Sequence, residues 1–197
     1  MGQTNLEPTA CATLQHLVAV VSQTVDLDTL YAQALEIVLE ALQADVVSLF
    51  LTDDEAQTLT PVAQRGNRHP FPPDSWPSLS LTAGLSGQVM QGGQPVFLTD
   101  LSGSLPLPYP PTWVAQEALH NLACFPLSAC SRKLGMLVVA NRQPRQFSPD
   151  TVDLAMTMGQ VLGNAICNGQ RIQEELLHKR LQLALHRIGA ALASTFD

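Results

Sequence analysis

Basic residues are scarce in this sequence: 10 Lys and Arg stand against 17 Asp and Glu among 197 residues, which gives a formal net charge of −7. Nucleic-acid-binding proteins need a basic surface for the phosphates, so nucleic acid is not an expected partner. Long apolar runs are absent too: none approaches the ~18–20 residues of a membrane span, and the first residues do not resemble a signal peptide. We therefore expect a cytoplasmic protein without membrane insertion.

Cysteine is also rare, with four residues: Cys11, Cys124, Cys130 and Cys167. This number is too small for the disulfide framework of a small secreted domain, so reduced thiols are expected. Cys124 and Cys130 lie near His120, but they form no Cys-x-x-Cys motif, and no second close Cys/His pair accompanies them. We interpret both as wall or core residues, because free cysteine is among the most buried residue types. A redox thiol or a metal ligand involving His120 is the alternative.

The hydrophobic pattern predicts helices at both ends of the chain and short strands between them. Two amphipathic helices are predicted over residues 10–21 and 26–42. A long helix is predicted from Ser148, a candidate N-cap followed by Pro149, because no proline occurs after that point. Strands are predicted at residues 45–54, 58–64, 95–100, 122–128 and 134–141, with a short helix at 84–91.

Two proline-rich segments, residues 67–81 and 105–113, are expected to form structured loops, because each proline removes a backbone donor and fixes φ. Residues 114–120 are read as a helical turn after the second loop. A turn is expected at residues 131–133, between the last two strands.

The late part of the long helix carries a coiled-coil seam, with apolar residues at alternating spacings of four and three. Its members are Leu177, Leu181, Ala184, Ile188 and Ala191. Residues 185–197 also repeat the pattern of residues 14–26 at an offset of 171. We therefore expect the chain to be part of a longer protein with tandem sensory domains.

The ordered set of motifs resembles the GAF domain family over roughly residues 27–170. The matching stretches are Ala44–Asp53, Gly84-Leu-Ser-Gly-Gln-Val89, Pro95–Asp100, Asn121–Leu127, Gly135–Asn141 and Phe147–Leu154. The resemblance implies an α+β fold: a central antiparallel sheet with helices on one face, loops over the other, and a pocket between sheet and loops. It predicts an N-terminal dimerisation helix (1–26), a GAF domain (27–170) and a coiled-coil linker helix (171–197) leading to a further domain.

The family pocket gives a set of candidate ligand-binding residues. The aromatic residues of the proline-rich loops are expected to cover its mouth, and two polar side chains, Ser48 and Gln64, to face it. Filling of the cavity by these side chains without any ligand is the alternative. The candidate set is Ser48, Phe50, Gln64, Trp76, Leu85, Phe97, Tyr109, Trp113 and Cys124.

The marks of the known ligand branches are mostly missing. Covalent bilin carriers have a Cys-His pair in the region of residues 113–120, which holds no cysteine. The acidic and hydroxyl lid residues of cyclic-nucleotide binders fall on Thr112, Ala115 and Leu119, and their strand glutamate falls near Val138, so several of the hydrogen-bond partners are lost. The free methionine sulfoxide reductases need several cysteines at the pocket. Haem ligation by His69 or by the histidine at 120 is open, and no cofactor is identified.

We therefore expect a non-catalytic sensory module of a bacterial-type signalling protein, without catalytic or metal-binding residues. The alternatives are a cysteine-based redox enzyme using Cys124, a cyclic-nucleotide-binding GAF domain and a ligand-free structural dimer. A homodimer is expected because the apolar stripes of the terminal helices have nothing else to cover them. The candidate interface residues are Leu14, Leu17, Val21, Leu177, Leu181, Ala184 and Ile188.

Overall fold

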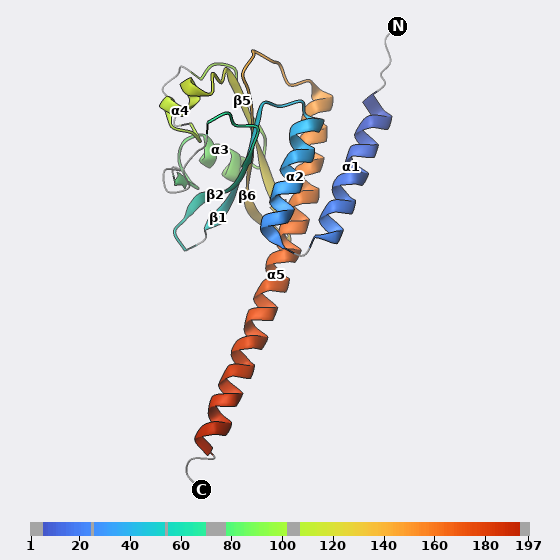
Figure 1. Ribbon diagram of the computed structural model, residues 1–197. Coiled ribbons are helices and arrows are strands. Elements are labelled where there is room, and N and C mark those ends of the chain that lie inside the picture. The colour runs from blue at the N-terminus through green and yellow to red at the C-terminus, as the bar shows by residue number, and fades with distance from the viewer. Residues whose placement is uncertain (1–5, 25, 54, 70–77, 102–106, 194–197) are drawn as a thin grey trace.

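A six-stranded antiparallel sheet with the order β3-β2-β1-β6-β5-β4 forms the centre of the structure (Figure 1). The structure is a computed structural model that describes residues 6–24, 26–53, 55–69, 78–101 and 107–193. The strands are β1 (Val46–Asp53), β2 (Thr58–Arg65), β3 (Leu79–Ser80), β4 (Val96–Leu98), β5 (Asn121–Ala129) and β6 (Arg132–Asn141). The expected α+β sheet architecture is confirmed.

The sheet has two different faces, because successive residues of a strand point to opposite sides. In β1, Val47 and Leu49 face one side, while Ser48 and Phe50 face the other. We call the first side, covered by the long helices, the helix face. We call the second, covered by short helices and connecting segments, the loop face. The central strands are buried on both faces, which explains their nearly continuous apolar sequences.

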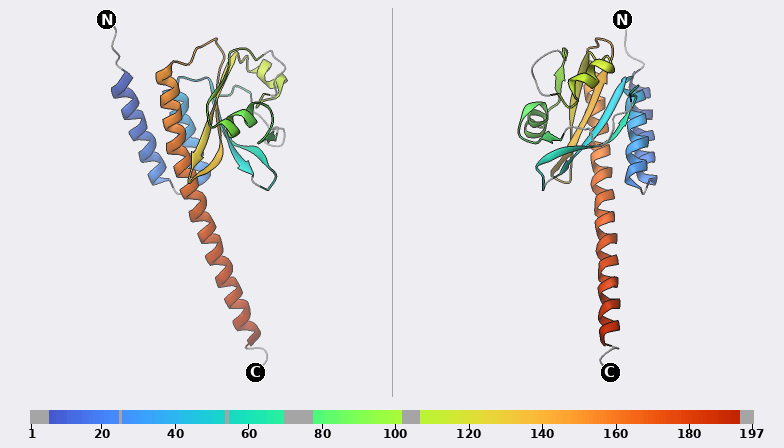
Figure 2. Two further views of the ribbon diagram at one scale, coloured as in Figure 1. Left: turned by 180° about the vertical axis from the view of Figure 1, so that it is seen from behind. Right: turned by 60° about the vertical axis from the view of Figure 1, so that its left-hand side comes forward.

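On the helix face lie α2 (Leu27–Ala41) and the first part of α5 (Pro149–Ala193), and α1 (Leu6–Gln23) packs on the outside of both (Figures 1 and 2). Asp26 begins α2 as its N-cap, and its carboxylate accepts a hydrogen bond from the Thr29 amide at 2.8 Å. Ser148 acts in the same way before α5, accepting from the Thr151 amide at 3.2 Å. Both predicted amphipathic helices and the long helix are therefore confirmed.

On the loop face lie α3 (Gly84–Gly92) and α4 (Pro111–Gln116). The helix expected within residues 114–120 begins earlier, because Pro111 fits the first helical position, where no backbone donor is needed. The expected turn at 131–133 is also displaced. The two central turn residues are Cys130 and Ser131, with φ of 53° and 59°.

Beyond the sheet, α5 continues as an extended rod (Figure 1). Residues 171–185 of this rod have exposed side chains. Among the described helices, none combines the length and hydropathy that a membrane span requires.

Candidate functional site

The loop face carries a buried group of polar and aromatic side chains. The Tyr109 hydroxyl donates a hydrogen bond to Ser48 Oγ at 2.8 Å. The Tyr109 ring lies 4.8 Å from that of Trp113 and 6.4 Å from that of Phe50, measured between centroids. Burial raises the pKa of the Tyr109 hydroxyl far above its ordinary value, so it stays protonated as a donor. A segment after β4 is thereby tied to the middle of the sheet.

Two further candidates, Leu85 on α3 and Cys124 on β5, belong to the same buried cluster. Sequence reasoning therefore placed Ser48, Phe50, Tyr109 and these two residues on the correct face. Each of these residues is nearly or fully inaccessible to solvent.

Gln64 supplies an unusual polar group beside this cluster. It lies directly opposite Ser48 in the pairing of β1 with β2. Its side-chain Nε2 is buried, and among the described residues it has no hydrogen-bond partner. A buried donor without a partner costs about 1–3 kcal/mol, so such groups in folded proteins need an explanation, such as a bound water or ligand.

Two candidates of the set remain, Trp76 and Phe97. Trp76 lies outside the described residues. Phe97 lies on the helix face instead, because it pairs with Ala123, and only its neighbours in β4 point to the loop face. The Phe97 ring packs edge-on against Phe125 at 6.1 Å and beside Phe147 at 5.7 Å, and the residue is 40 % exposed. Its expected place in the pocket was wrong.

A charged network at one end of the loop face was missed by the sequence analysis. The Glu117 side chain, which follows α4, has no exposed surface. Its Oε1 accepts hydrogen bonds from the backbone amides of Arg68 (2.8 Å) and His69 (2.6 Å), and its Oε2 pairs with the Arg142 guanidinium. Burial acts to raise the pKa of the Glu117 carboxyl, but these hydrogen bonds outweigh it and hold the pKa below its ordinary value.

Arg142 is the hub of this network. Its Nη2 donates to the Gly66 carbonyl at 2.9 Å, its Nε to the Glu117 carbonyl at 3.1 Å, and its Nη1 lies 3.3 Å from Asp45 Oδ1. The network thus joins the end of β6, the start of β1, the segment after β2 and the end of α4. The only sequence signal was a charged residue placed directly after each of two apolar elements.

The buried thiol of Cys124 argues against the redox-enzyme alternative. Cys124 is fully buried, and this burial raises the pKa of its thiol far above the ordinary value. Because the thiolate is the nucleophile in cysteine chemistry, Cys124 is poorly suited to attack a substrate near neutral pH. No cluster of metal-ligating side chains occurs among the residues that the structure describes.

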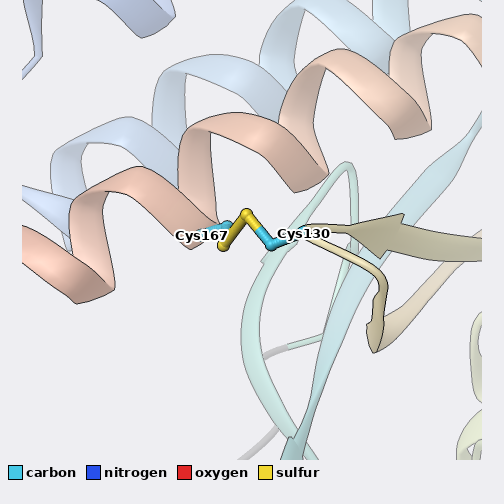
Figure 3. The surroundings of a disulfide bond; sticks show 2 residues. All are labelled: Cys130 and Cys167. Atoms are coloured by element: carbon cyan, nitrogen blue, oxygen red, sulfur yellow. A yellow bond between two sulfur atoms is a disulfide. The ribbon is translucent and has the colours of Figure 1, made fainter.

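Of the other three cysteines, two differ from the expected reduced thiols. Cys130 and Cys167 form a disulfide (Figure 3), while Cys11 is a free exposed thiol on α1. The expectation failed because the two partners are 37 residues apart and form no recognisable motif.

The expected interface residues fall into two groups. Leu17 is fully buried within the chain, and Leu14 and Val21 pack partly against the same core, so the role of Leu17 as a contact residue between chains was wrong. Leu177 and Leu181 are 58 % and 54 % exposed on the free part of α5. Ala184 is also exposed, and the side chain of Ile188 lies outside the described part of the chain.

A model of the GAF domain family matches residues 24–166. The match covers well over half of the chain, and the chain therefore belongs to the GAF domain family. No protein of curated function matches it.

Solved structures show the same fold at low sequence identity. The GAF domain of a phosphoenolpyruvate-protein phosphotransferase from Coxiella burnetii is 21 % identical, with a TM-score of 0.71 over 84 % of this chain and 96 % of that one. A free methionine-R-sulfoxide reductase from Neisseria meningitidis, solved with its substrate, is 16 % identical (TM-score 0.69, covering 87 % and 96 %). Residues 122 to 287 of a methyl-accepting chemotaxis protein are 18 % identical (TM-score 0.63, covering 79 % and 98 %).

Proposed function

We propose that the chain is a non-catalytic sensory module of a cytoplasmic signalling protein of bacterial type, such as a sensor histidine kinase. It binds a small molecule against the loop face, forms a homodimer through its terminal helices and transmits the signal along α5. Membership of the GAF family and the shared fold with a chemotaxis protein support this proposal.

The observation that carries the ligand proposal is the unpaired amide of Gln64. It lies beside a hydroxyl pair, Ser48 and Tyr109, and close to an aromatic wall. A ligand with a hydrogen-bond acceptor, such as a carbonyl, a carboxylate or a ring nitrogen, would satisfy the donor. Aromatic surroundings with few polar groups suit a small planar molecule better than a highly charged one.

Native mass spectrometry of the purified chain, beside the same sample under denaturing conditions, tests this proposal. We expect a protein mass that includes a small species released on denaturation. Gln64→Leu should lose that species, whereas Gln88→Leu, the same change at an exposed position on α3, should retain it. A wild-type chain without any released species would contradict the ligand proposal and favour a structural module.

The dimer proposal depends on the uncovered leucines of α5. Leu177 and Leu181 are exposed at coiled-coil spacing on a helix that has already left its own domain. At the junction of α1, α2 and α5 a groove of about 450 Å³ adds to this apolar surface, with Val18 and Ile172 at its rim, each about half exposed. Such a surface is typical of a protein interface.

Replacing Leu181 by aspartate tests the dimer. Leu181→Asp places a charge in the seam and should produce a monomer in size-exclusion chromatography with light scattering. Leu183→Asp is the matched control, because Leu183 is also more than half exposed but lies off the seam, so this variant should remain dimeric. A monomeric wild-type chain with a fully helical α5 would contradict the proposal.

A further inference from the structure

A disulfide links the sheet to α5 near the point where this helix leaves the domain. Cys130 lies in the two-residue turn between β5 and β6, and Cys167 lies on α5, with their Cα atoms 6.8 Å apart (Figure 3). The bond therefore connects a surface turn of the sheet to the helix that we propose as the output element.

The position of Cys167 completes a row on α5. Gly159 and Gly163 precede it at intervals of four residues and so share its helix face. A Cβ at Gly159 would lie 3.4 Å from Leu127 Cδ2, and one at Gly163 would lie 3.2 Å from the Ser128 carbonyl oxygen. The contact at Gly159 would be an ordinary one, whereas that at Gly163 would be tight, so Gly163 lets α5 lie close to β5. The disulfide follows at the end of the row.

Soon after the disulfide, α5 leaves the domain. Gly169 still meets the Leu27 side chain of α2, but residues 171–185 are exposed. The covalent bond thus stands at the exit of the helix, where it limits how far the following segment can tilt or slide.

The residue types in this turn do not suit its backbone conformation. Cys130 and Ser131 have φ of 53° and 59°, a conformation that glycine and asparagine adopt more readily. Turn preference therefore gives no reason for a cysteine at this position, whereas a bond to α5 does.

The two cysteine residues differ in exposure. Cys130 is exposed at the tip of the hairpin, whereas Cys167 is 8 % exposed and packs with Ala129 and Leu134. A thiol reagent can therefore approach Cys130 from solvent. In an attack on Cys130, the less exposed Cys167 is the leaving group.

We propose that Cys130–Cys167 is a redox-active disulfide that reacts with small thiols or with a thioredoxin-like dithiol, and that its reduction loosens α5 from the sheet at the exit point. A reductant thiolate attacks Cys130 Sγ, forms a mixed disulfide and expels the Cys167 thiolate, which takes up a proton. A second reductant thiol attacks the mixed disulfide, forms the reductant's own disulfide and releases Cys130 as a thiol. The protein gains two electrons and two protons, and the reductant loses them.

This inference rests on the proposed function for its consequence, the control of an output helix, but not for its chemistry. Disulfides in the cytosol are rare and are mainly transient, catalytic or redox-sensing, which agrees with a reactive bond in the proposed cytoplasmic sensor. A structural disulfide would instead resist reduction by the glutathione pool.

The test uses the full chain, equilibrated in glutathione buffers from oxidising to reducing, then trapped with N-ethylmaleimide and mapped by peptide mass spectrometry. The linked peptide pair should fall by about tenfold or more across this range. Two internal controls are present: Cys11 should be alkylated in the reducing buffers and carry glutathione in the oxidising ones, and Cys124 should stay unmodified while the protein is folded.

Hydrogen exchange on the same samples measures the consequence. Amides of α5 around residues 160–170 should exchange several-fold faster after reduction, because local opening of the helix becomes easier. Cys130→Ser should show the fast pattern in every buffer, and Cys11→Ser should respond like the wild type. A linked pair that never forms, one that persists in reducing buffer, or unchanged α5 exchange would each overturn the proposal.

Native mass spectrometry of these samples separates this proposal from the proposed sensor function. A redox-responsive α5 in a monomer without ligand would support the redox site while contradicting the sensor dimer. A liganded dimer with both cysteines permanently reduced would do the reverse.

Discussion

Arg142→Ala should be one of the most destabilising single substitutions at the loop face. The change removes the guanidinium that pairs with Glu117, whose side chain has no exposed surface, and leaves this carboxylate with two backbone amides and His69. Breaking a buried ion pair by removing one partner costs about 3–5 kcal/mol. The Asp45 pair adds little to this figure, because the Asp45 side chain is 38 % exposed and its charge is screened by water.

Circular dichroism measures this cost, as a change in unfolding free energy in urea and as a change in Tm on heating. For a chain of this size each kcal/mol shifts Tm by about 2–4 °C, so Arg142→Ala should lower Tm by roughly 6–20 °C. Arg65→Ala is the matched control, because Arg65 forms a 3.7 Å pair with Glu36 in which both side chains are well exposed. That variant should lose less than about 1 kcal/mol.

A double-mutant cycle shows whether the loss comes from the pair itself. Glu117→Gln keeps an acceptor for the backbone amides and should cost about 1.5–3 kcal/mol, the value of a charge-assisted hydrogen bond. The double variant Arg142→Ala, Glu117→Gln should cost less than the sum of the two single changes by about 0.5–3 kcal/mol. Strict additivity, or a cost of Arg142→Ala as small as that of Arg65→Ala, would refute the reasoning.

The network also predicts an acid dependence with a definite sign. The folded-state pKa of Glu117 is depressed below the value of 4.5 for an unperturbed glutamate. Its contribution to stability is therefore complete above about pH 4.5 and is lost as the pH falls below that value through the folded-state pKa. The difference in unfolding free energy between wild type and Glu117→Gln should shrink from pH 7 to pH 4. A difference that grows would show the opposite sign of the shift.

Three further perturbations test the packing of the sheet. Tyr109→Phe removes the buried hydrogen bond to Ser48 and should cost about 1–2 kcal/mol in urea unfolding, with no change in secondary structure. Gly135→Ala places a Cβ against a backbone carbonyl of β1, so it should yield a chain that is mostly insoluble or destabilised by more than about 3 kcal/mol in thermal unfolding. Adding dithiothreitol to open Cys130–Cys167 should lower the unfolding free energy by about 4 kcal/mol, from the loss of a cross-link over 37 residues. An unchanged urea midpoint would count against that bond.

The sequence predicted the sheet and the face on which most of the described candidate residues lie, because both depend on local patterns. Alternation along β1 and β5 assigns Ser48, Phe50 and Cys124 to one face once the strands are located. Phe97 failed because β4 has only three residues at the sheet edge, and a shift of one residue there exchanges the faces. A short strand gives too few positions to fix its register from the sequence.

The charged network and the disulfide could not be predicted for a different reason. Glu117 and Arg142 are 25 residues apart, and each by itself has the sequence environment of a solvated residue at the end of an element. Cys130 and Cys167 likewise become partners only after α5 crosses β5. Both interactions depend on the tertiary fold, and no regular spacing in the sequence indicates which residues will meet.

The two faces of β5 suggest how a ligand could act on α5. Cys124 of β5 contributes to the loop face, while Phe125 and Leu127 contribute to the helix face on which α5 lies. Because a strand in a packed sheet moves as a unit, a ligand that shifts β5 from the loop face also shifts the surface beneath α5. Gly163 makes this contact close, and the disulfide at the end of the row decides whether the exit of α5 must follow the sheet. In the proposed sensor the ligand would therefore supply the movement and the redox state of Cys130–Cys167 would set how much of it reaches the free part of α5.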